Sequence, residues 1–379
     1  MLNLAVILIC CILYSLLGHI FLTVLLSFFS KFKIKKDENY SPSVCFMIAA
    51  YNEEDQIAEK IKNTLEIDYP KEKLKIVVVS DGSTDNTDTI VKTFSKEGVE
   101  LRRVEGRVGK TEARNVAVLE RTEEIIVFSD ATAIYEKNSV KELVSNFSDS
   151  SIGMVSGKLK YFDKSLSHVG AATKIYWTYE LMIKKVQSRL KTLTGAVGCI
   201  NAFRRDLFFK LPPNVIEDFT FPLMIIAQGK RVIFENNAVA YERTTQNSNQ
   251  EYKMRLRVIR GGMTGFSYAL PRLVKAKQWT AILQLFSHKV MRWGMPLFLI
   301  ALYLVSIAGL IEGKNNDFFL LLLLMQNLIF FSGILGFFNT KNKFLAFANY
   351  FLVVNTASAQ AFIKTLTSKL EATWDTNIY

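Results

Sequence analysis

Residues 75–85 read KIVVVSDGSTD, an apolar run that ends at an aspartate and passes into a polar turn. A short apolar run that a turn closes favours a buried strand of a parallel sheet. The turn, DGSTD at 81–85, is rich in side chains that accept hydrogen bonds from the free N–H groups at a helix start. This stretch therefore predicts a strand whose carboxyl end presents Asp81, followed by a helix over about 86–97.

The same pattern occurs on both sides of this stretch. Val44–Ala49 is an apolar run that YNEE follows at 51–54, and Glu124–Ser129 is one that DAT follows at 130–132. Helices are expected over 53–67, 109–121 and 167–188, and further strands around 152–160, 195–205 and 231–234. Alternating strands and helices predict an α/β fold with a parallel sheet covered on both faces. Acidic residues just past the carboxyl ends of such strands point into the crevice where these sheets bind ligands.

Long apolar runs flank this region. Half of the 379 residues are hydrophobic, and the runs lie at 2–30 and at about 294–311, 318–338 and 344–363. Each is long enough to cross a hydrocarbon layer of about 30 Å, so an integral membrane protein is expected. A cleaved signal peptide is the alternative for the first run. It is disfavoured because that run lacks a basic start, exceeds the usual length and shows no small-residue cleavage site before Lys31.

The lysines at 31, 33, 35 and 36 directly follow the first run. The positive-inside rule places this cluster in the cytoplasm of the cell, and the N-terminus outside. Five parts are expected: an N-terminal transmembrane helix at 1–30, a cytoplasmic domain at 31–270, an amphipathic interface helix at 271–293, three transmembrane helices at 294–363 and a tail at 364–379. The sequence leaves open on which side of the cell membrane the tail lies.

The net charge of +12 does not indicate nucleic-acid binding, because the basic residues include clusters beside the apolar runs, where anionic lipid headgroups attract them. The four cysteines have no metal or redox spacing and are expected to be reduced packing residues. The three histidines stand far apart at 19, 168 and 288, so a zinc site is not expected. A hard cation such as Mg²⁺ or Mn²⁺ needs only one or two carboxylates with substrate phosphates, and Asp130 is the candidate ligand.

Five motifs together resemble those of membrane-bound family 2 glycosyltransferases with the GT-A fold, in the branch that forms polysaccharides. They are IAAYNEE at 48–54, VSDGSTD at 79–85, GKTEARN at 109–115, FSDA at 128–131 and IED at 216–218. The resemblance covers about residues 44–262. It implies a nucleotide-sugar-binding, Rossmann-like domain in the cytoplasm, and a multi-pass protein of the cell membrane.

The resemblance also assigns site residues. Tyr51, Glu53 and Asp81 would contact the nucleoside of a sugar donor, uridine by expectation, while Lys110 and Arg260 would meet its diphosphate. Asp130 would hold the Mg²⁺ or Mn²⁺ ion that bridges the phosphates. Asp218 would be the general base of an inverting displacement, a step worth about 10²- to 10⁴-fold in rate, with Glu217 and Arg257 on the acceptor side.

Two motifs depart from the family pattern. The Asp-x-Asp motif appears as Asp130-Ala131-Thr132, so its third position offers only a hydroxyl group. The Gln-x-x-Arg-Trp signature of processive members has its nearest counterpart in RVIRG at 257–261, where glycine replaces tryptophan. Two acceptors therefore stay open: a growing extracellular or cell-surface polysaccharide, and a lipid such as a polyprenyl phosphate or glycolipid that receives one sugar.

Three other classes of protein are disfavoured. GKT at 109–111 imitates a Walker A motif, but a P-loop ATPase needs glycine at Val104, and the preceding LRR at 101–103 makes a poor buried strand. A dinucleotide-binding oxidoreductase lacks its G-x-G-x-x-G motif. A transporter or channel is disfavoured because the apolar runs carry no acidic or basic residue in their middle.

Overall fold

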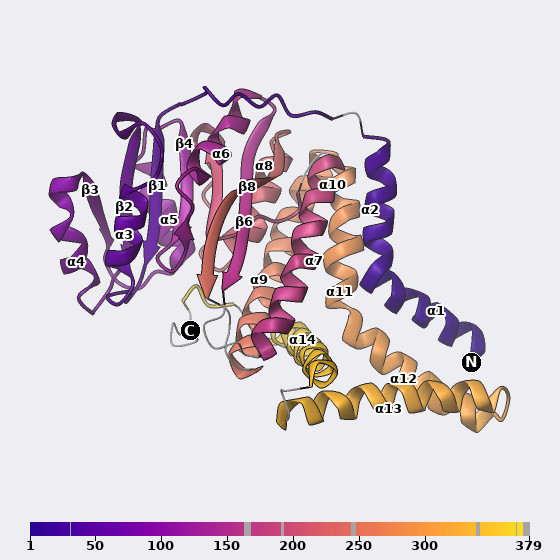
Figure 1. Ribbon diagram of the computed structural model, residues 1–379. Helices are drawn as coiled ribbons and strands as arrows, with labels where there is room; N and C mark the ends of the chain where they lie inside the picture. Colours follow the sequence, from indigo (N-terminus) through magenta and orange to yellow (C-terminus); the bar gives the residue numbers. More distant parts are fainter. Residues whose placement is uncertain are drawn as a thin grey trace.

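The structure is a computed structural model that describes residues 1–30, 32–162, 168–190, 193–243, 248–338, 342–368 and 370–373, with side chains left undescribed at 162 and 168–176. A mixed sheet and a group of long helices lie side by side (Figure 1). The motifs identified in the sequence lie on the sheet and on the helices that cover it, and each apolar run is helical. The side chain of His168 is therefore not among those described. Residues 244–247 and the last six residues of the predicted tail lie outside the described residues altogether.

Eight strands of the described chain form one sheet. Across it they lie in the order β3 (Val99–Val104), β2 (Leu74–Asp81), β1 (Val44–Ala50), β4 (Ile125–Asp130), β7 (Ile200–Arg204), β6 (Ile152–Phe162), β8 (Arg231–Arg243) and β5 (Ile134–Tyr135). The first four strands are parallel, so the predicted parallel arrangement is confirmed for this half. In the other half, β7 and β5 are antiparallel to their neighbours.

Strand β1 explains why its sequence is apolar throughout. Val44, Phe46 and Ile48 point to one face of the sheet and Cys45 and Met47 to the other, and all five are fully buried. The first face packs against the helices α3 (Ile57–Leu65), α4 (Thr87–Thr93) and α6 (Ser139–Val144). The second packs against α5 (Lys110–Leu119), α8 (Glu217–Ala227) and α9 (Ser248–Lys275). A strand covered on both sides has no position for a polar side chain.

The segment expected to make a poor buried strand, LRR at 101–103, is the edge strand β3. Its basic side chains are tolerated because only one neighbour, β2, pairs with it. Arg102 reaches Glu120 with an Nη2–Oε1 distance of 2.6 Å. Charged side chains on an edge also prevent pairing with other chains. The sequence thus correctly indicated that residues 101–103 do not form a buried strand, but it did not predict that they form an edge strand.

Short helical turns complete the sheet domain. They are 3₁₀ turns at Lys71–Lys73, Ser95–Glu97, Ser145–Ser148 and Arg205–Leu207.

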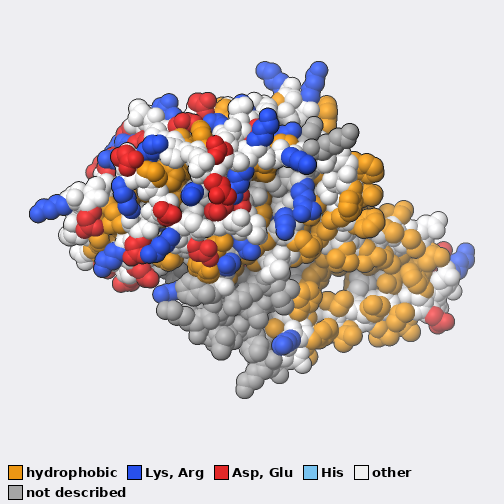
Figure 2. Space-filling view, turned by 45° about the horizontal axis from the view of Figure 1, so that its top comes forward, with side chains coloured by type: hydrophobic (Ala, Val, Ile, Leu, Met, Phe, Trp, Pro, Cys, Tyr) orange, Lys and Arg blue, Asp and Glu red, His pale blue; other side chains and the backbone are white. Residues whose placement is uncertain are grey.

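Three helices among the described residues are long and apolar enough to cross a membrane: the continuous helix Leu2–Phe28, α12 (Met295–Glu312) and α13 (Asn316–Phe338). The first consists of α1 (Leu2–Leu13), a π-helical turn (Tyr14–Gly18) and α2 (His19–Phe28). Hydrophobic side chains gather over this helical part in Figure 2, whereas charged groups of both signs cover the sheet domain. About three C-terminal spans were expected, and two are found. The third run forms α14 (Lys343–Thr367), which is less apolar and buries the polar residues Asn349 and Ser358.

The predicted interface helix at 271–293 begins later than expected, because α9 continues through Lys275. It consists of α10 (Trp279–Gln284), a π-helical turn (Leu285–Val290) and α11 (Met291–Trp293). Trp279 and Leu283 are 61% and 50% exposed, and the position of this helix at a membrane surface stays a prediction. The opposite side of this helix packs into the protein.

Helix α7 (His168–Leu190) joins the sheet domain to both the interface helix and the N-terminal helix. Its buried Glu180 pairs with Arg292, and Lys289 lies 3.4 Å from the same carboxylate. The hydroxyl of Tyr179 donates to the carbonyl oxygen of Leu16 at 2.6 Å. His19 of α2 stacks on His288 at 4.9 Å between ring centroids. These contacts hold the N-terminal helix against α7 and the helical segment 279–293.

Candidate active site

The loops after β1 and β2 are joined by hydrogen bonds at the carboxyl edge of the sheet. The amide nitrogen of Asn52 donates to the hydroxyl of Ser83 at 3.2 Å, and that of Thr84 donates to the side-chain oxygen of Asn52 at 2.8 Å. Asn52 has a positive φ of 53°, which asparagine tolerates better than most residues. The two predicted nucleoside-binding motifs therefore form one connected surface.

Two of the predicted donor-binding residues follow β1. The ring of Tyr51 lies under the guanidinium group of Arg107, 4.3 Å from it. The amide nitrogen of Glu53 donates to the hydroxyl of Thr87 at 2.8 Å, which fixes the turn. Burial, helped by the negative charges of Asp130 and Asp85, raises the pKa of the Glu53 carboxyl to about 7. Strands β1 and β4 are paired with Ala49 opposite Asp130, so the loop that carries Glu53 begins beside the end of β4.

Asp81 holds the loop that leads into α5. Its two carboxylate oxygens accept hydrogen bonds from the backbone nitrogens of Val108, at 2.8 Å, and Gly109, at 2.9 Å. Burial raises the pKa of Asp81, against these two hydrogen bonds, which lower it. Asp81 therefore shapes the loop beside Lys110, and its contact with a nucleoside stays a prediction.

Asp130 pairs with two cations from α5. The Nζ atom of Lys110 lies 2.6 Å from its Oδ1 atom, and Nη2 of Arg114 lies 2.9 Å from the same oxygen. Burial opposes ionisation here, but the charges of Lys110 and Arg114 prevail and lower the pKa of Asp130 to about 2. The predicted metal ligand and the predicted diphosphate-binding lysine are thus direct neighbours.

Arg114, within the GKTEARN motif, has no role assigned by the resemblance, and it proves central. Its side chain is 1% exposed, and it binds Glu217, Asp130 and the carbonyl oxygen of Ser129. Glu217, expected on the acceptor side, is thus directed toward this buried arginine. Arg114, on α5, therefore links the end of β4 to the start of α8, where the residue after Glu217 is Asp218.

Asp218 lies between α8 and the loop before β7. Its backbone oxygen accepts a hydrogen bond from the nitrogen of Ala196 at 2.8 Å. Burial raises the pKa of its carboxyl, against the positive charges of Lys110, Lys184 and Arg257. A carboxylate with a raised pKa accepts a proton more readily, as a general base must. Lys184 was not identified from the sequence, because helix α7 has no motif to mark it.

Helix α9 contributes the two predicted arginines. Arg257 acts electrostatically on Asp130, Asp218 and Glu242, which places it among the charges of the site. The side chain of Arg260 reaches from α9 to the end of α14. There its Nη2 atom donates to the carbonyl and hydroxyl oxygens of Ser368, each at 2.8 Å. Its contact with a donor diphosphate stays a prediction.

Gly261, which departs from the Gln-x-x-Arg-Trp signature, is explained by helix packing. A Cβ atom there would overlap the side chain of Ile216, which lies two residues before Asp218. Helix α9 therefore approaches α8 closely at this point. Near the same edge, a Cβ atom on Gly109 (φ 93°) would overlap the carbonyl oxygen of Ala372, so the segment 370–373 lies against the loop that Asp81 holds.

Glu242, on β8, is a site residue that the sequence did not suggest. Its Oε1 atom accepts a hydrogen bond of 2.7 Å from the hydroxyl of Thr132. Burial and the negative charge of Asp130 raise the pKa of Glu242 to about 7. It lies 110 residues after Thr132 and belongs to a strand rather than a motif, so no local signal marks it.

The carboxylates fit a hard divalent cation only in part. Among the described residues, no group of three or more His, Cys, Asp or Glu side chains is arranged to hold a metal ion. Asp130 supplies carboxylate oxygen, which suits Mg²⁺ and Mn²⁺, and both ions commonly take their remaining ligands from substrate phosphates and water. The donor set therefore fits a metal that binds together with a nucleotide.

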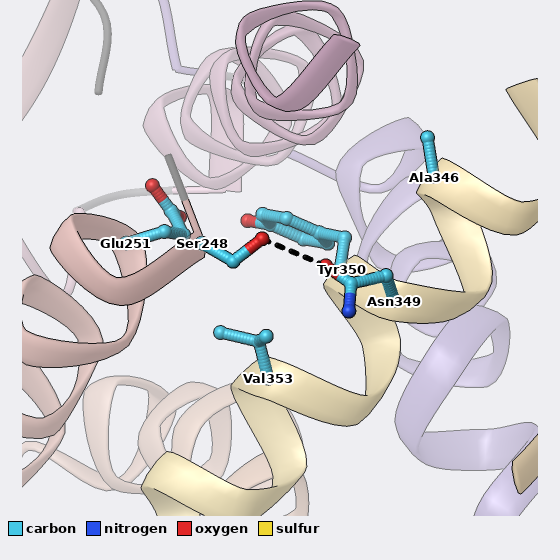
Figure 3. A pocket seen from close by; sticks show the side chains of 6 residues that line it. All are labelled: Ser248, Glu251, Ala346, Asn349, Tyr350 and Val353. Atoms are coloured by element: carbon cyan, nitrogen blue, oxygen red, sulfur yellow. Dashed lines mark hydrogen bonds between the residues drawn. The ribbon is translucent and has the colours of Figure 1, made fainter. Parts of the chain in front are cut away.

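A small cavity of about 10 Å³ lies away from this site, between α9 and α14 (Figure 3). Ser248 and Asn349, which line it, are joined by a hydrogen bond of 2.9 Å. This volume is about that of one water molecule, so the cavity is too small for a sugar nucleotide.

The chain is similar to known glycosyltransferases. Residues 45–211 match the family model "Glycosyl transferase family 2". A poly-β-1,6-N-acetyl-D-glucosamine synthase of Staphylococcus aureus is 27% identical over 232 residues, which are 58% of this chain and 54% of the relative. A probable glycosyltransferase of Bacillus subtilis, YdaM, is 26% identical over 256 residues, or 65% and 61% of the two chains. The match thus spans little more than half the length of these curated relatives.

A solved structure is similar over nearly the whole chain. The mannosyltransferase PcManGT from Pyrobaculum calidifontis, in complex with GDP-Man and Mn²⁺, superposes with a TM-score of 0.72. The sequence identity is 21%, and the match covers 96% of this chain and 99% of the other. At this identity the likeness concerns the fold, which is the GT-A fold with helices attached.

Proposed function

We propose that this protein transfers a sugar from a nucleotide sugar to a growing extracellular or cell-surface polysaccharide, and the match of residues 45–211 to the glycosyl transferase family 2 model supports this. The observation that carries the proposal is that residues suited to a diphosphate and residues suited to an acceptor hydroxyl lie together at one edge of the sheet. Lys110 and Asp130 form a pair suited to a diphosphate and its metal, and Asp218 acts electrostatically within the same cluster. A site with these two parts suits the transfer of a group from a diphosphate to a hydroxyl.

The donor is proposed to lie across the loops after β1 and β2. Tyr51, Glu53 and Asp81 would contact its nucleoside, and uridine is the nucleoside that the family resemblance favours. Lys110 and Arg260 would bind the diphosphate through charge-assisted hydrogen bonds. The position of Lys110 at the first residue of α5 supports this, because helix starts attract anions.

Asp130 would hold the Mg²⁺ or Mn²⁺ ion. When bound, such an ion neutralises negative charge that develops on the leaving diphosphate. Arg114 keeps the Asp130 carboxylate ionised and fixed, whether or not Lys110 turns toward a phosphate. Asp130 is thus prepared to bind a cation at neutral pH.

Asp218 is proposed as the general base of an inverting reaction. It would take the proton of the acceptor hydroxyl as that oxygen bonds to the anomeric carbon, while the bond from this carbon to the diphosphate oxygen breaks. Its raised pKa supports the role, and Lys184 and Arg257 keep the carboxylate available as a base by limiting that rise. Glu217 would position this helix start through Arg114, on the acceptor side of the site.

The acceptor has two candidates. A polysaccharide is favoured by the relative named as a poly-β-1,6-N-acetyl-D-glucosamine synthase and by the membrane helices. A lipid that receives a single sugar is favoured by Gly261, which stands where processive enzymes have tryptophan. The size of the product distinguishes the two, because only a polymerase forms a ladder of lengths.

The protein is proposed to lie in the cell membrane with its sheet domain in the cytoplasm. The three apolar helices support membrane insertion, and the lysines after α2 support this orientation. A hollow of about 870 Å³ between α2, α7 and α10 is lined by apolar side chains together with Lys33 and Arg231. This combination of apolar and basic groups suits the surface of a bilayer.

The test is release of nucleoside diphosphate by purified membranes that contain the protein. The donor panel should include UDP-glucose, UDP-N-acetylglucosamine and GDP-mannose, each with Mg²⁺ or Mn²⁺. We expect release from one UDP-linked sugar and loss of that release in Asp218→Asn. If no donor is turned over with polysaccharide primers and acceptor lipids supplied, the proposal is wrong; a GDP-linked donor would correct only the nucleoside.

A further inference from the structure

The third position of the Asp-x-Asp motif has lost its carboxylate, and another carboxylate lies beside it. Thr132 occupies that position, and its hydroxyl donates to Oε1 of Glu242 at 2.7 Å. The two residues meet because β5 pairs antiparallel with β8, with Ile134 opposite Tyr241. Sheet pairing therefore brings the end of the motif next to a glutamate far along the chain.

Glu242 differs from the deeply buried glutamates of this protein. Glu217 pairs with Arg114, Glu180 with Arg292 and Glu251 with Arg255. Within the part of the chain that the structure describes, Glu242 forms no direct ion pair, although the positive charges of Lys110 and Arg257 and the negative charge of Asp130 all act on it. Two carboxylates whose like charges repel are stabilised together by a cation that both of them bind.

We propose that Glu242 supplies the second carboxylate of the metal site, in place of the missing aspartate of the motif, with Thr132 holding it toward Asp130. Asp130 would be one ligand, at the end of β4, and Glu242 the other, on β8. Phosphate oxygens and water would complete the shell, as Mg²⁺ and Mn²⁺ allow. This inference rests on the proposed function, because it needs a metal that binds with a nucleotide.

The test measures Mn²⁺ binding directly and needs no turnover. Purified full-length protein in detergent is titrated with Mn²⁺ in the presence of UDP, and in parallel of GDP, while electron paramagnetic resonance reports the free ion. We expect Glu242→Gln to weaken Mn²⁺ binding by about tenfold or more, on the order of what loss of a supporting group at a metal site costs. Glu235→Gln, on the same strand, is the matched control and should bind Mn²⁺ as the parent protein does.

A rescue variant makes the test specific. Thr132→Asp restores the family motif, so Thr132→Asp combined with Glu242→Gln should return Mn²⁺ affinity to within about threefold of the parent. If Glu242→Gln fails to fold, as judged by gel filtration and thermal unfolding, Glu242→Asp replaces it. That variant keeps the charge but withdraws the carboxylate by one methylene group, and weaker Mn²⁺ binding is again expected.

The outcomes separate this inference from the proposed function. If Asp130→Asn loses Mn²⁺ binding and Glu242→Gln keeps it, the inference is wrong and the proposed function stands. The inference is equally wrong if Glu242→Gln changes only the affinity for the sugar part of a donor, since Glu242 would then bind a hydroxyl group. If the parent protein binds no Mn²⁺ with either nucleotide, metal dependence itself is wrong.

Discussion

The Nζ atom of Lys110 lies 2.6 Å from the Oδ1 atom of Asp130, so the two residues expected to bind opposite partners, a phosphate and a cation, neutralise each other. On the proposed function, a metal ion would compete with Lys110 for this oxygen, and a diphosphate would compete with Asp130 for this ammonium group. Metal and nucleotide should therefore each make binding of the other easier. Such mutual enhancement is a coupling free energy that both ligands share.

Lys110→Met should separate the two ligands. Donor affinity should fall by about tenfold or more, because a hydrogen bond to a charged group contributes about 1.5–3 kcal/mol. Affinity for Mn²⁺ alone should stay equal or rise, since the competing cation is gone. Titration calorimetry with UDP, and paramagnetic resonance with Mn²⁺, measure the two affinities. If Lys110→Met lost affinity for both UDP and Mn²⁺, the competition between Lys110 and the metal for Asp130 would be contradicted.

Asp218→Asn should abolish transfer while donor binding persists. The amide group is similar in size to the carboxylate but cannot take a proton, so turnover should fall by about 10²- to 10⁴-fold. The donor dissociation constant should change by less than about threefold, because the proposed contact of Asp218 is with the acceptor. Equilibrium binding and product release are compared in one preparation. Near-normal transfer by the variant would remove Asp218 from the mechanism.

Arg114→Met should destabilise the fold. It leaves the carboxylate of Glu217 without its cation in a buried place, which costs about 3–5 kcal/mol when one partner of a buried pair is removed. The control is Arg102→Met, which breaks an exposed pair with Glu120 and should cost less than about 1 kcal/mol. Thermal unfolding followed by tryptophan fluorescence reports both. Equal effects of the two variants would mean that the buried bridge adds nothing.

Stability should depend on pH through Glu53. Its pKa is raised from 4.5 to about 7 in the folded protein, so the native state holds a proton that the unfolded state has already released. Folding stability from this group is therefore unaffected below pH 4.5, declines as the pH rises toward 7, and stays reduced above that value.

Glu53→Gln removes that ionisation. The melting temperature of the variant minus that of the parent should therefore be larger at about pH 8 than at about pH 4.5. The control is Glu59→Gln, on the exposed side of α3, for which this difference should be the same at both pH values. A difference between variant and parent that is the same at both pH values would contradict the shifted ionisation.

Gly261→Trp, which restores the residue of the processive signature, should impair the protein. The new side chain must displace Ile216, and through it the start of α8 that carries Asp218. Overpacking of this kind costs about 1–3 kcal/mol or more. Val258→Trp is the control, since that position on α9 is 43% exposed. A fully stable and active Gly261→Trp protein would show that the helices separate easily here.

Local sequence patterns predicted the elements whose causes are local. The strand at Lys75–Ser80 is found as Leu74–Asp81, and the helix expected over 109–121 is found as Lys110–Leu119. Asp81 and Asp130 are correctly placed at the ends of strands that flank β1, because the carboxyl ends of parallel strands share one edge. The same logic could not suggest Glu242, whose place depends on how β8 pairs with β5.

Two further features needed the three-dimensional packing. Arg114 was hidden because its partners, Glu217 and Asp130, are separated from it by 103 and 16 residues. Strand β3 was missed because its charges exclude a central position but not an edge. In both cases the sequence shows the residue type, and only the tertiary arrangement shows why it is tolerated.

The contacts between the N-terminal helix and α7 bear on how this protein can be divided. Tyr179 binds the backbone at Leu16, and the ring of His19 covers that of His288. A chain freed of its first 30 residues would expose this surface, beside the buried charges around Glu180. The N-terminal helix is therefore part of the folding unit of this chain rather than a detachable tether, and a fragment obtained by deleting it should aggregate.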